Sequence, residues 1–134
     1  MKKVTYESWL TELVGNLQEY FNLSGWRILL KFSDKEEKEG TYAENEVVTP
    51  YMFSTITFYK SSRKNFKSGD IDFLVMAVVH EMVHIFLDPF NDYMHPHLSL
   101  TTTPLFMNSL EQQTQKLTTV FLKTLPKSII PPLR

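Results

Sequence analysis

Apolar residues recur along the first half of the chain at two spacings, one typical of helices and one typical of strands. From 7 to 23 they fall three or four residues apart, which predicts an amphipathic helix that covers a core. After this helix the pattern alternates, which predicts a half-buried strand over 26–32 with one face formed by Trp26, Ile28, Leu30 and Phe32. Two further strands are predicted, at 41–48 before Pro50 and at 51–59, where β-branched and aromatic residues are frequent.

One nearly continuous apolar segment dominates the second half of the chain. Residues 70–87 are apolar almost all round a helix, as in a buried core helix. Asp70 is a suitable N-cap, and the pair Asp88-Pro89 predicts that this helix ends about one turn beyond His84, because a residue before proline is pushed out of the helical region.

The segments that flank this helix are more polar. Residues 61–69 include Arg63, Lys64 and Lys67, which could contact an acidic partner, although a solvated loop is the interpretation we favour. Residues 91–103 predict a long polar loop of the kind that is often functional. A last helix is expected to open at Thr103-Pro104 and to end at Pro126, with a buried face formed by Phe106, Leu110, Leu117 and Phe121.

These elements predict one α+β domain over residues 1–134, with 127–134 as a C-terminal tail that packs on the surface. Its expected parts are an N-terminal helix, a small and mostly antiparallel sheet of about three strands, a buried helix and a C-terminal helix. A chain of 134 residues is long enough for one core and too short for two. The contents of 43% hydrophobic and 22% charged residues are those of an ordinary globular protein.

Charge and cysteine content narrow the choice of partners. The net charge of -1 gives no electrostatic reason to expect nucleic acid, and the longest apolar run, 73–79, is far shorter than the roughly 20 residues of a membrane span. No signal peptide is apparent at the N-terminus, so we expect a cytoplasmic monomer that is not bound to a membrane. Because cysteine is absent, any zinc ion must be bound by nitrogen and oxygen ligands.

The apolar segment is interrupted by the pattern H-E-x-x-H, formed by His80, Glu81 and His84. On a helix this spacing sets two imidazoles one turn apart, where both can bind one zinc ion while the glutamate faces the open coordination position. Ala77, three residues before His80, leaves room on the same face for an ion and a substrate. The alternative is a pair of core histidines that donate to backbone carbonyls, with Glu81 reaching solvent.

A catalytic zinc site needs a third protein ligand. Glu111 is the first choice, because the last helix can fold back antiparallel to the motif helix and no other glutamate follows Glu81. His95 and His97 in the predicted loop are the next choice, and Asp92 is a further possibility. Asp88 ranks low, because its eight-residue separation from His80 corresponds to about 12 Å along a helix.

His80, Glu81 and His84 resemble the motif of the zincin metallopeptidases, and more closely that of the gluzincin branch, in which a glutamate on a later helix is the third ligand. The layout also resembles the minimal single-domain zincins of phages and other mobile elements, in which a tryptophan-led strand, here beginning at Trp26, precedes the motif helix. The resemblance implies a zincin-like fold, a zinc cofactor and a ligand role for Glu111. The metzincin branch is disfavoured, because Leu87 and Phe90 stand where it has glycine and histidine.

The resemblance implies a zinc-dependent metallopeptidase that hydrolyses a peptide or protein amide bond, with Glu81 activating a water molecule. Tyr93, His95 or His97 could stabilise the oxyanion, and an exposed edge of the 51–59 strand could pair with an extended peptide, unless a loop covers it. Two alternatives stay open. One is a zinc amidase that acts on a non-protein amide, and the other is an inactive, zincin-shaped binding or assembly protein.

Overall fold

The computed structural model describes residues 3–35, 41–99 and 101–133 of the chain. Within these residues, the order of elements along the chain is α1 (Tyr6–Tyr20), β1 (Arg27–Phe32), β2 (Ala43–Val48), η1 (Thr49–Tyr51), β3 (Phe53–Phe58), α2 (Lys60–Ser68), α3 (Ile71–Met94), η2 (His95–His97), α4 (Thr102–Thr124) and η3 (Lys127–Ile129), where η marks a 3-10 helix. This α+β architecture and the three predicted strands are confirmed.

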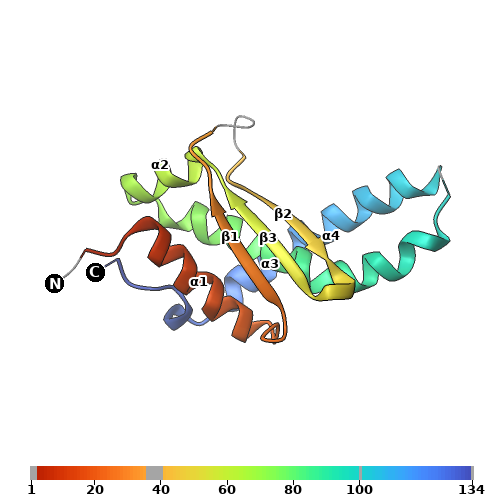
Figure 1. Cartoon of the computed structure of the whole chain (residues 1–134), viewed down its shortest axis with the longest axis horizontal. Coiled ribbons are helices and arrows are strands. Elements are labelled where there is room, and N and C mark those ends of the chain that lie inside the picture. Colours follow the sequence, from red (N-terminus) through yellow and green to blue (C-terminus); the bar gives the residue numbers. More distant parts are fainter. Residues whose placement is uncertain (1–2, 36–40, 100, 134) are drawn as a thin grey trace.

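The sheet is mixed and has the strand order β1-β3-β2 (Figure 1). The chain reverses direction between β1 and β2 and again at η1, so β3 returns parallel to β1 and antiparallel to β2. The expected antiparallel pairing therefore holds for only one of the two strand pairs. Because β3 enters between the other two strands, it is the central strand, and β2 is the edge strand nearest to α3 and α4.

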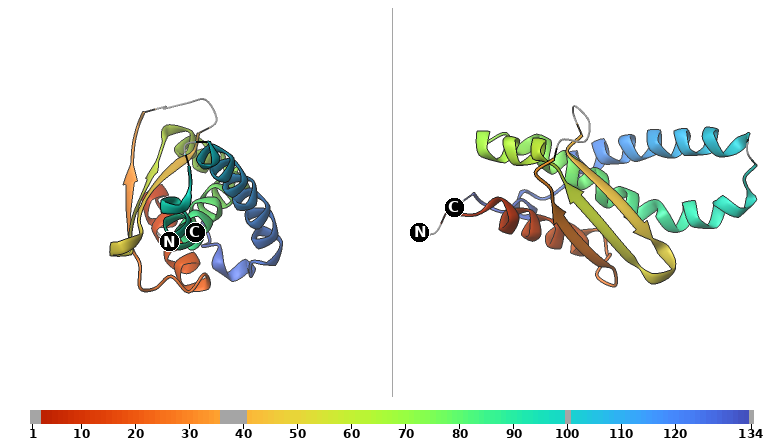
Figure 2. Two further views of the ribbon diagram at one scale, coloured as in Figure 1. Left: turned by 90° about the vertical axis from the view of Figure 1, so that its right-hand side faces the viewer. Right: turned by 45° about the horizontal axis from the view of Figure 1, so that its top comes forward.

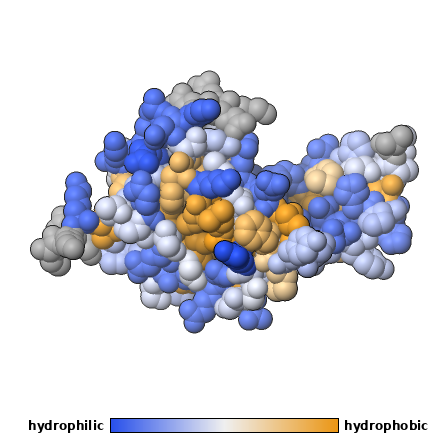
Figure 3. Space-filling view, in the orientation of Figure 1, coloured by the Kyte–Doolittle hydropathy of each residue, from blue (hydrophilic) through white to orange (hydrophobic). Residues whose placement is uncertain are grey.

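Helices cover one face of the sheet (Figure 2, left). The predicted alternation in β1 is confirmed, since Ile28, Leu30 and Phe32 are the less exposed positions of the strand. The opposite face is open, and Figure 3 shows apolar surface over its middle with hydrophilic residues around it. Leu29, which alternates with the inward-facing residues of β1, is 47% exposed. The core lies between the covered face, α1 and α3, and its completely buried members include Trp9, Leu13, Leu17, Ile56, Phe58, Val78, Val79 and Met82.

The central helix α3 continues past Pro89 to Met94, so the expected helix end at Asp88-Pro89 is wrong. Together α3 and α4 form an antiparallel pair, the α3–α4 hairpin, which extends beyond the sheet (Figure 2, right). Proline inside a helix costs stability, but packing across the hairpin supports the turns that follow it. Phe90 contacts Phe106 with ring centroids 5.8 Å apart. The predicted loop 91–103 is accordingly replaced by helix at most of its described positions.

Residues 60–68 form the helix α2, so the solvated loop expected there is wrong. The segment has no helical apolar period, but its single aromatic residue, Phe66, packs against Tyr6 and Trp9 of α1. Arg63 donates to Glu7 at 3.0 Å, so this cation binds a carboxylate of the same chain. Tertiary contacts with α1 thus stabilise a helix that the local sequence does not predict.

The C-terminal segment packs on α1, as expected for the tail. The Trp9 indole N–H donates to the carbonyl of Pro131 at 2.9 Å, and the Asn16 amide donates to the carbonyl of Ile129 at 2.8 Å. Ile129 and Pro131 are both buried. These contacts hold the C-terminal segment against α1 at the edge of the core.

By length and composition alone, the helical stretch Ile71–His97 could cross a membrane. The core helix of a globular protein passes the same test, and α3 packs against the sheet, α1, α2 and α4. A single such helix is weak evidence for a membrane span.

Candidate metal centre

The two motif histidines lie one turn apart on α3, and their side chains meet. The Nε2 atoms of His80 and His84 are 3.1 Å apart, and the rings are close to perpendicular, with centroids separated by 4.6 Å. This is the geometry that the four-residue spacing predicts. The side chains are 17% and 29% exposed, so both lie at the boundary between the core and a surface pocket.

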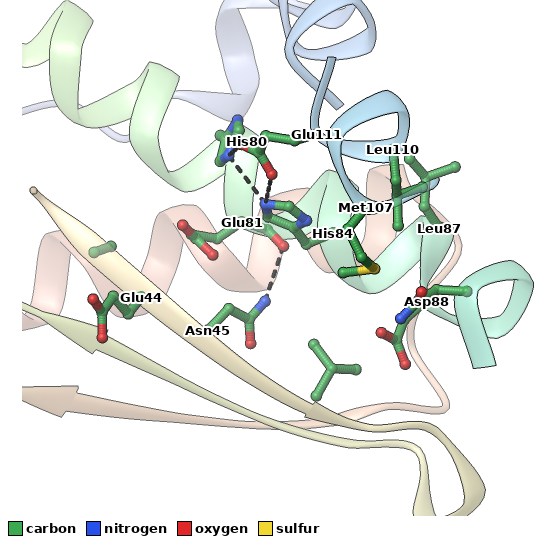
Figure 4. Close-up of a pocket in the computed structure, with 13 residues that line it drawn as sticks. Glu44, Asn45, His80, Glu81, His84, Leu87, Asp88, Met107, Leu110 and Glu111 are labelled. Atoms are coloured by element: carbon green, nitrogen blue, oxygen red, sulfur yellow. Dashed lines mark hydrogen bonds and ion pairs between the residues drawn. The ribbon is translucent and has the colours of Figure 1, made fainter. Parts of the chain in front are cut away.

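Glu111 reaches the same point from α4, on the opposite side of the hairpin (Figure 4). Its Oε1 lies 3.1 Å from His80 Nε2, and its Oε2 lies 3.4 Å from His84 Nε2. The antiparallel course of α4 explains this meeting, because it carries a residue 27 positions beyond His84 back to the level of the motif. The sequence-based first choice for the third ligand is therefore the glutamate that stands beside the histidine pair.

These donors fit the requirements of a zinc ion. Zinc in proteins is bound by imidazole nitrogen and carboxylate oxygen at about 2.0–2.2 Å, so neighbouring ligands of a tetrahedral site lie roughly 3.4 Å apart. The distances of 3.1, 3.1 and 3.4 Å that join His80, His84 and Glu111 are close to that value. Among the described residues, this trio is also the one group of histidine and acidic side chains placed to hold a metal ion.

The surroundings of His84 favour its neutral imidazole, which is the form that binds a metal ion. Burial lowers the pKa of His84, and His80 lowers it further, whereas Glu111 and Asp88 act in the opposite direction. A His84 ring that stays neutral near pH 7 keeps a nitrogen lone pair for a cation.

Glu81 is more deeply buried than His80, His84 and Glu111, with 7% of its surface exposed. Burial is the main reason why its pKa rises to about 8 in the metal-free protein, and the charges of Glu111 and Glu44 raise it further. A carboxyl group with such a pKa beside a possible metal site is a candidate general base. The alternative of ordinary core histidines predicted that Glu81 reaches solvent, which does not agree with this burial.

A pocket of about 480 Å³ opens beside the trio, between the edge strand β2, α3 and α4 (Figure 4). Its lining residues are Ala43, Glu44, Asn45, Val47, His80, Glu81, His84, Leu87, Asp88, Asn91, Met107, Leu110 and Glu111. A smaller pocket of about 250 Å³ shares Ala43, His80 and Glu81 with it and extends toward Ala77 and Gln115. His80 and Glu81 therefore line open space on two sides.

Asn45 joins the edge strand to the motif helix, and the sequence analysis missed it. Its amide donates to the backbone carbonyl of Glu81 at 3.0 Å, and its carbonyl oxygen accepts from the hydroxyl of Ser54. The alternation of the sequence could have identified it, because Asn45 shares the inward face of β2 with the apolar residues Ala43 and Val47. A polar residue on the covered face of a strand indicates a specific partner.

The other proposed ligands do not reach this group. His95 begins η2, eleven residues after His84, which corresponds to about 16 Å along the helix. Tyr93, His95 and His97 are exposed, and none of them lines the two pockets, so the structure gives no support to their expected ligand or oxyanion roles. Asp92 is likewise exposed. Asp88 lines the larger pocket but accepts from the hydroxyl of Thr49 and lies outside the trio.

Comparison of the chain with protein-family models, with curated proteins and with solved structures finds no match. The geometry and chemistry of the site are therefore the basis for any functional assignment.

We expect the stability of the metal-free protein to fall between pH 6.5 and about 8. Folded Glu81, with a pKa of about 8, keeps a proton that the unfolded chain, with its ordinary pKa of 4.5, has lost. The folded state then binds more protons, so the free energy of unfolding falls with rising pH, by at most about 1.4 kcal/mol per unit. His84 acts oppositely, but only below its ordinary pKa of 6.5.

Urea denaturation in the presence of a chelator measures this slope. Glu81→Gln removes the titrating group, so its free energy of unfolding should change less than that of the wild type over the same pH range. Equal slopes in the two proteins would show that Glu81 is not the group that retains the proton.

We expect Glu111→Ala to raise the dissociation constant for zinc by more than about 100-fold, which exceeds the usual effect of an outer-shell change. The matched control is Glu46→Ala, which removes the same charge from an exposed position of β2 outside both pockets. Competition with a chromophoric chelator measures the affinity. If His95→Ala or His97→Ala weakens zinc binding while Glu111→Ala does not, the third ligand comes from η2, which follows α3 in the α3–α4 hairpin.

Proposed function

We propose that this chain is a zinc-dependent metallopeptidase that hydrolyses a peptide or protein amide bond. The observation that carries the proposal is the convergence of His80, His84 and Glu111 beside the buried carboxyl group of Glu81, at the wall of an open pocket. Two imidazoles and one carboxylate with an adjacent acid form the donor set of a catalytic zinc site, whereas structural sites commonly use cysteine. The proposal agrees with the H-E-x-x-H spacing in the sequence.

In this proposal His80, His84 and Glu111 hold the metal ion. When bound, zinc supplies a Lewis acid that polarises a substrate carbonyl and lowers the pKa of a water molecule. The rings of His80 and His84 keep their Nε2 atoms directed at each other and at Glu111 (Figure 4), so little rearrangement of the chain is needed to hold an ion.

Glu81 is the proposed general base. Its carboxylate takes a proton from the attacking water and then delivers it to the nitrogen of the leaving amine. Burial gives the group a raised pKa, and a carboxyl group that titrates near the working pH can both accept and release a proton. The hydrogen bond from Asn45 to the Glu81 carbonyl fixes this part of the helix relative to the strand.

The edge strand β2 is the proposed binding surface for the substrate backbone. The 51–59 strand, whose edge could have paired with a peptide if it were exposed, has no free edge, because β3 is central and is paired with β1 and β2. On its side away from β3, β2 lies beside the metal-binding trio and lines the larger pocket. An extended peptide could pair with the backbone of this strand and pass directly over the motif.

We expect the zinc-loaded protein to hydrolyse a peptide library and a chelator to abolish the activity. Glu81→Gln should keep about one zinc per chain and lose at least about 100-fold in kcat, because general-base catalysis contributes roughly 10²–10⁴-fold. Glu46→Gln, on the exposed face of β2, is the matched control. Mass spectrometry of the peptides and elemental analysis of the protein provide the two readouts.

Undiminished hydrolysis by Glu81→Gln would exclude this residue as the base. A protein that binds zinc but cleaves no peptide would contradict the peptidase proposal, and activity on other amides would then identify an amidase. A protein that neither binds zinc nor changes its melting temperature when zinc is added would contradict the metal centre itself.

A further inference from the structure

The larger pocket carries negative charge and no cationic side chain. Among the described residues that line it, none is lysine or arginine, and the sequence contains neither between Lys67 and Lys116. This stretch includes all of α3 and the first half of α4, the two helices that form the pocket with β2. The acidic residues of the lining are Glu44, Glu81, Asp88 and Glu111.

The negative charge persists whether or not a metal ion is bound. A divalent ion offsets two of the four carboxylates, and two negative charges remain. Without the ion, Glu44, Asp88 and Glu111 still contribute acidic side chains to the lining of the pocket, and no lysine or arginine among the described lining residues offsets them. A concave surface lined by charges of one sign concentrates ligands of the opposite sign.

Asp88 has a defined position in this pocket. It lies one helical turn after His84, about 6 Å along the axis of α3, and it is only partly exposed. Its Oδ2 accepts a hydrogen bond from Thr49, the first residue of η1, which follows β2 directly. The carboxylate is therefore held at the end of the pocket where α3 and the end of β2 approach each other, as Figure 4 shows.

Asn91 adds a second polar group at the same end of the pocket. It lies three residues after Asp88 on α3, lines the pocket and is partly exposed. A lysine ammonium brings three N–H donors and an arginine guanidinium brings five, so either group can donate to the Asp88 carboxylate and to a polar neighbour at the same time.

The remaining lining suits the rest of such a side chain. Apart from Ala43, four larger apolar residues line the same pocket, and methylene groups of lysine or arginine pack well on surfaces of this kind while the charged end binds acceptors. These residues are Val47, Leu87, Met107 and Leu110. The pocket thus combines an apolar wall near the metal-binding trio with an acidic end at Asp88.

We propose that this pocket selects cationic substrates, and that Asp88 and Asn91 bind a lysine or arginine side chain within two residues of the cleaved bond. The inference rests on the proposed peptidase function, and it adds the class of substrate. Asp88 is in this account a specificity-determining residue and takes no part in holding the metal.

Three short alanine-serine peptides that differ only in a central lysine, norleucine or glutamate test the proposal. Isothermal titration with the zinc-loaded Glu81→Gln protein measures binding without cleavage, and kcat/KM is measured with the zinc-loaded wild type. We expect the lysine peptide to be preferred over norleucine by about tenfold or more, and glutamate to be the poorest ligand. Asp88→Asn should reduce the lysine-to-norleucine ratio about tenfold, and Asp88→Lys should favour glutamate.

Asp92→Asn is the matched control, because it removes the same charge from the same helix outside the pocket and should leave the ratio unchanged. Equal binding of the three peptides, no binding of any of them, or an unchanged ratio in Asp88→Asn would overturn the cationic selectivity. Cleavage without a lysine preference would overturn it too, while leaving the peptidase proposal intact. Asp88-dependent binding without cleavage would support the selectivity and contradict the peptidase function.

Discussion

Burial of the polar side chains of His80, Glu81 and His84 within an apolar helix is the constraint on which the rest of this structure depends. Polar and ionisable groups in a core need partners, because water no longer solvates them. His80 and His84 meet this requirement through each other and through Glu111, which comes from a different helix. Glu81 meets it by retaining a proton, as its raised pKa indicates. A cation bound by the trio would satisfy the donors together and lower the cost of an ionised Glu81.

The architecture around the motif follows from this constraint. The α3–α4 hairpin returns Glu111 to the level of the histidines, and its length comes from the continuation of α3 through Pro89. On the other side, Asn45 bonds the edge strand to the carbonyl of Glu81, and Ser54 of the central strand holds Asn45 in turn. The open space beside the trio is therefore bounded by elements that are each tied to α3. Its shape is set by the fold rather than by a long loop.

The sequence predicted the features that depend on local periodicity. The helix that carries the motif, the one-turn spacing of His80 and His84, and the inward face of β1 all follow from residue spacing and are present. The prediction that Glu111 lies beside the histidines required only that the last helix fold back antiparallel to the motif helix. The features that were missed depend on contacts distant in sequence. Packing of Phe66 against α1 stabilises α2, and packing of Phe90 against Phe106 supports the part of α3 beyond Pro89. The order of the strands determines which strand edges of the sheet are unpaired.

Anomalous scattering at the zinc absorption edge, measured on crystals grown with zinc, tests the central claim most directly. The account requires one strong peak about 2.0–2.2 Å from Nε2 of His80, Nε2 of His84 and a carboxylate oxygen of Glu111. A peak elsewhere, or two histidine rings hydrogen-bonded only to each other and to Glu111 in the presence of saturating zinc, would contradict it.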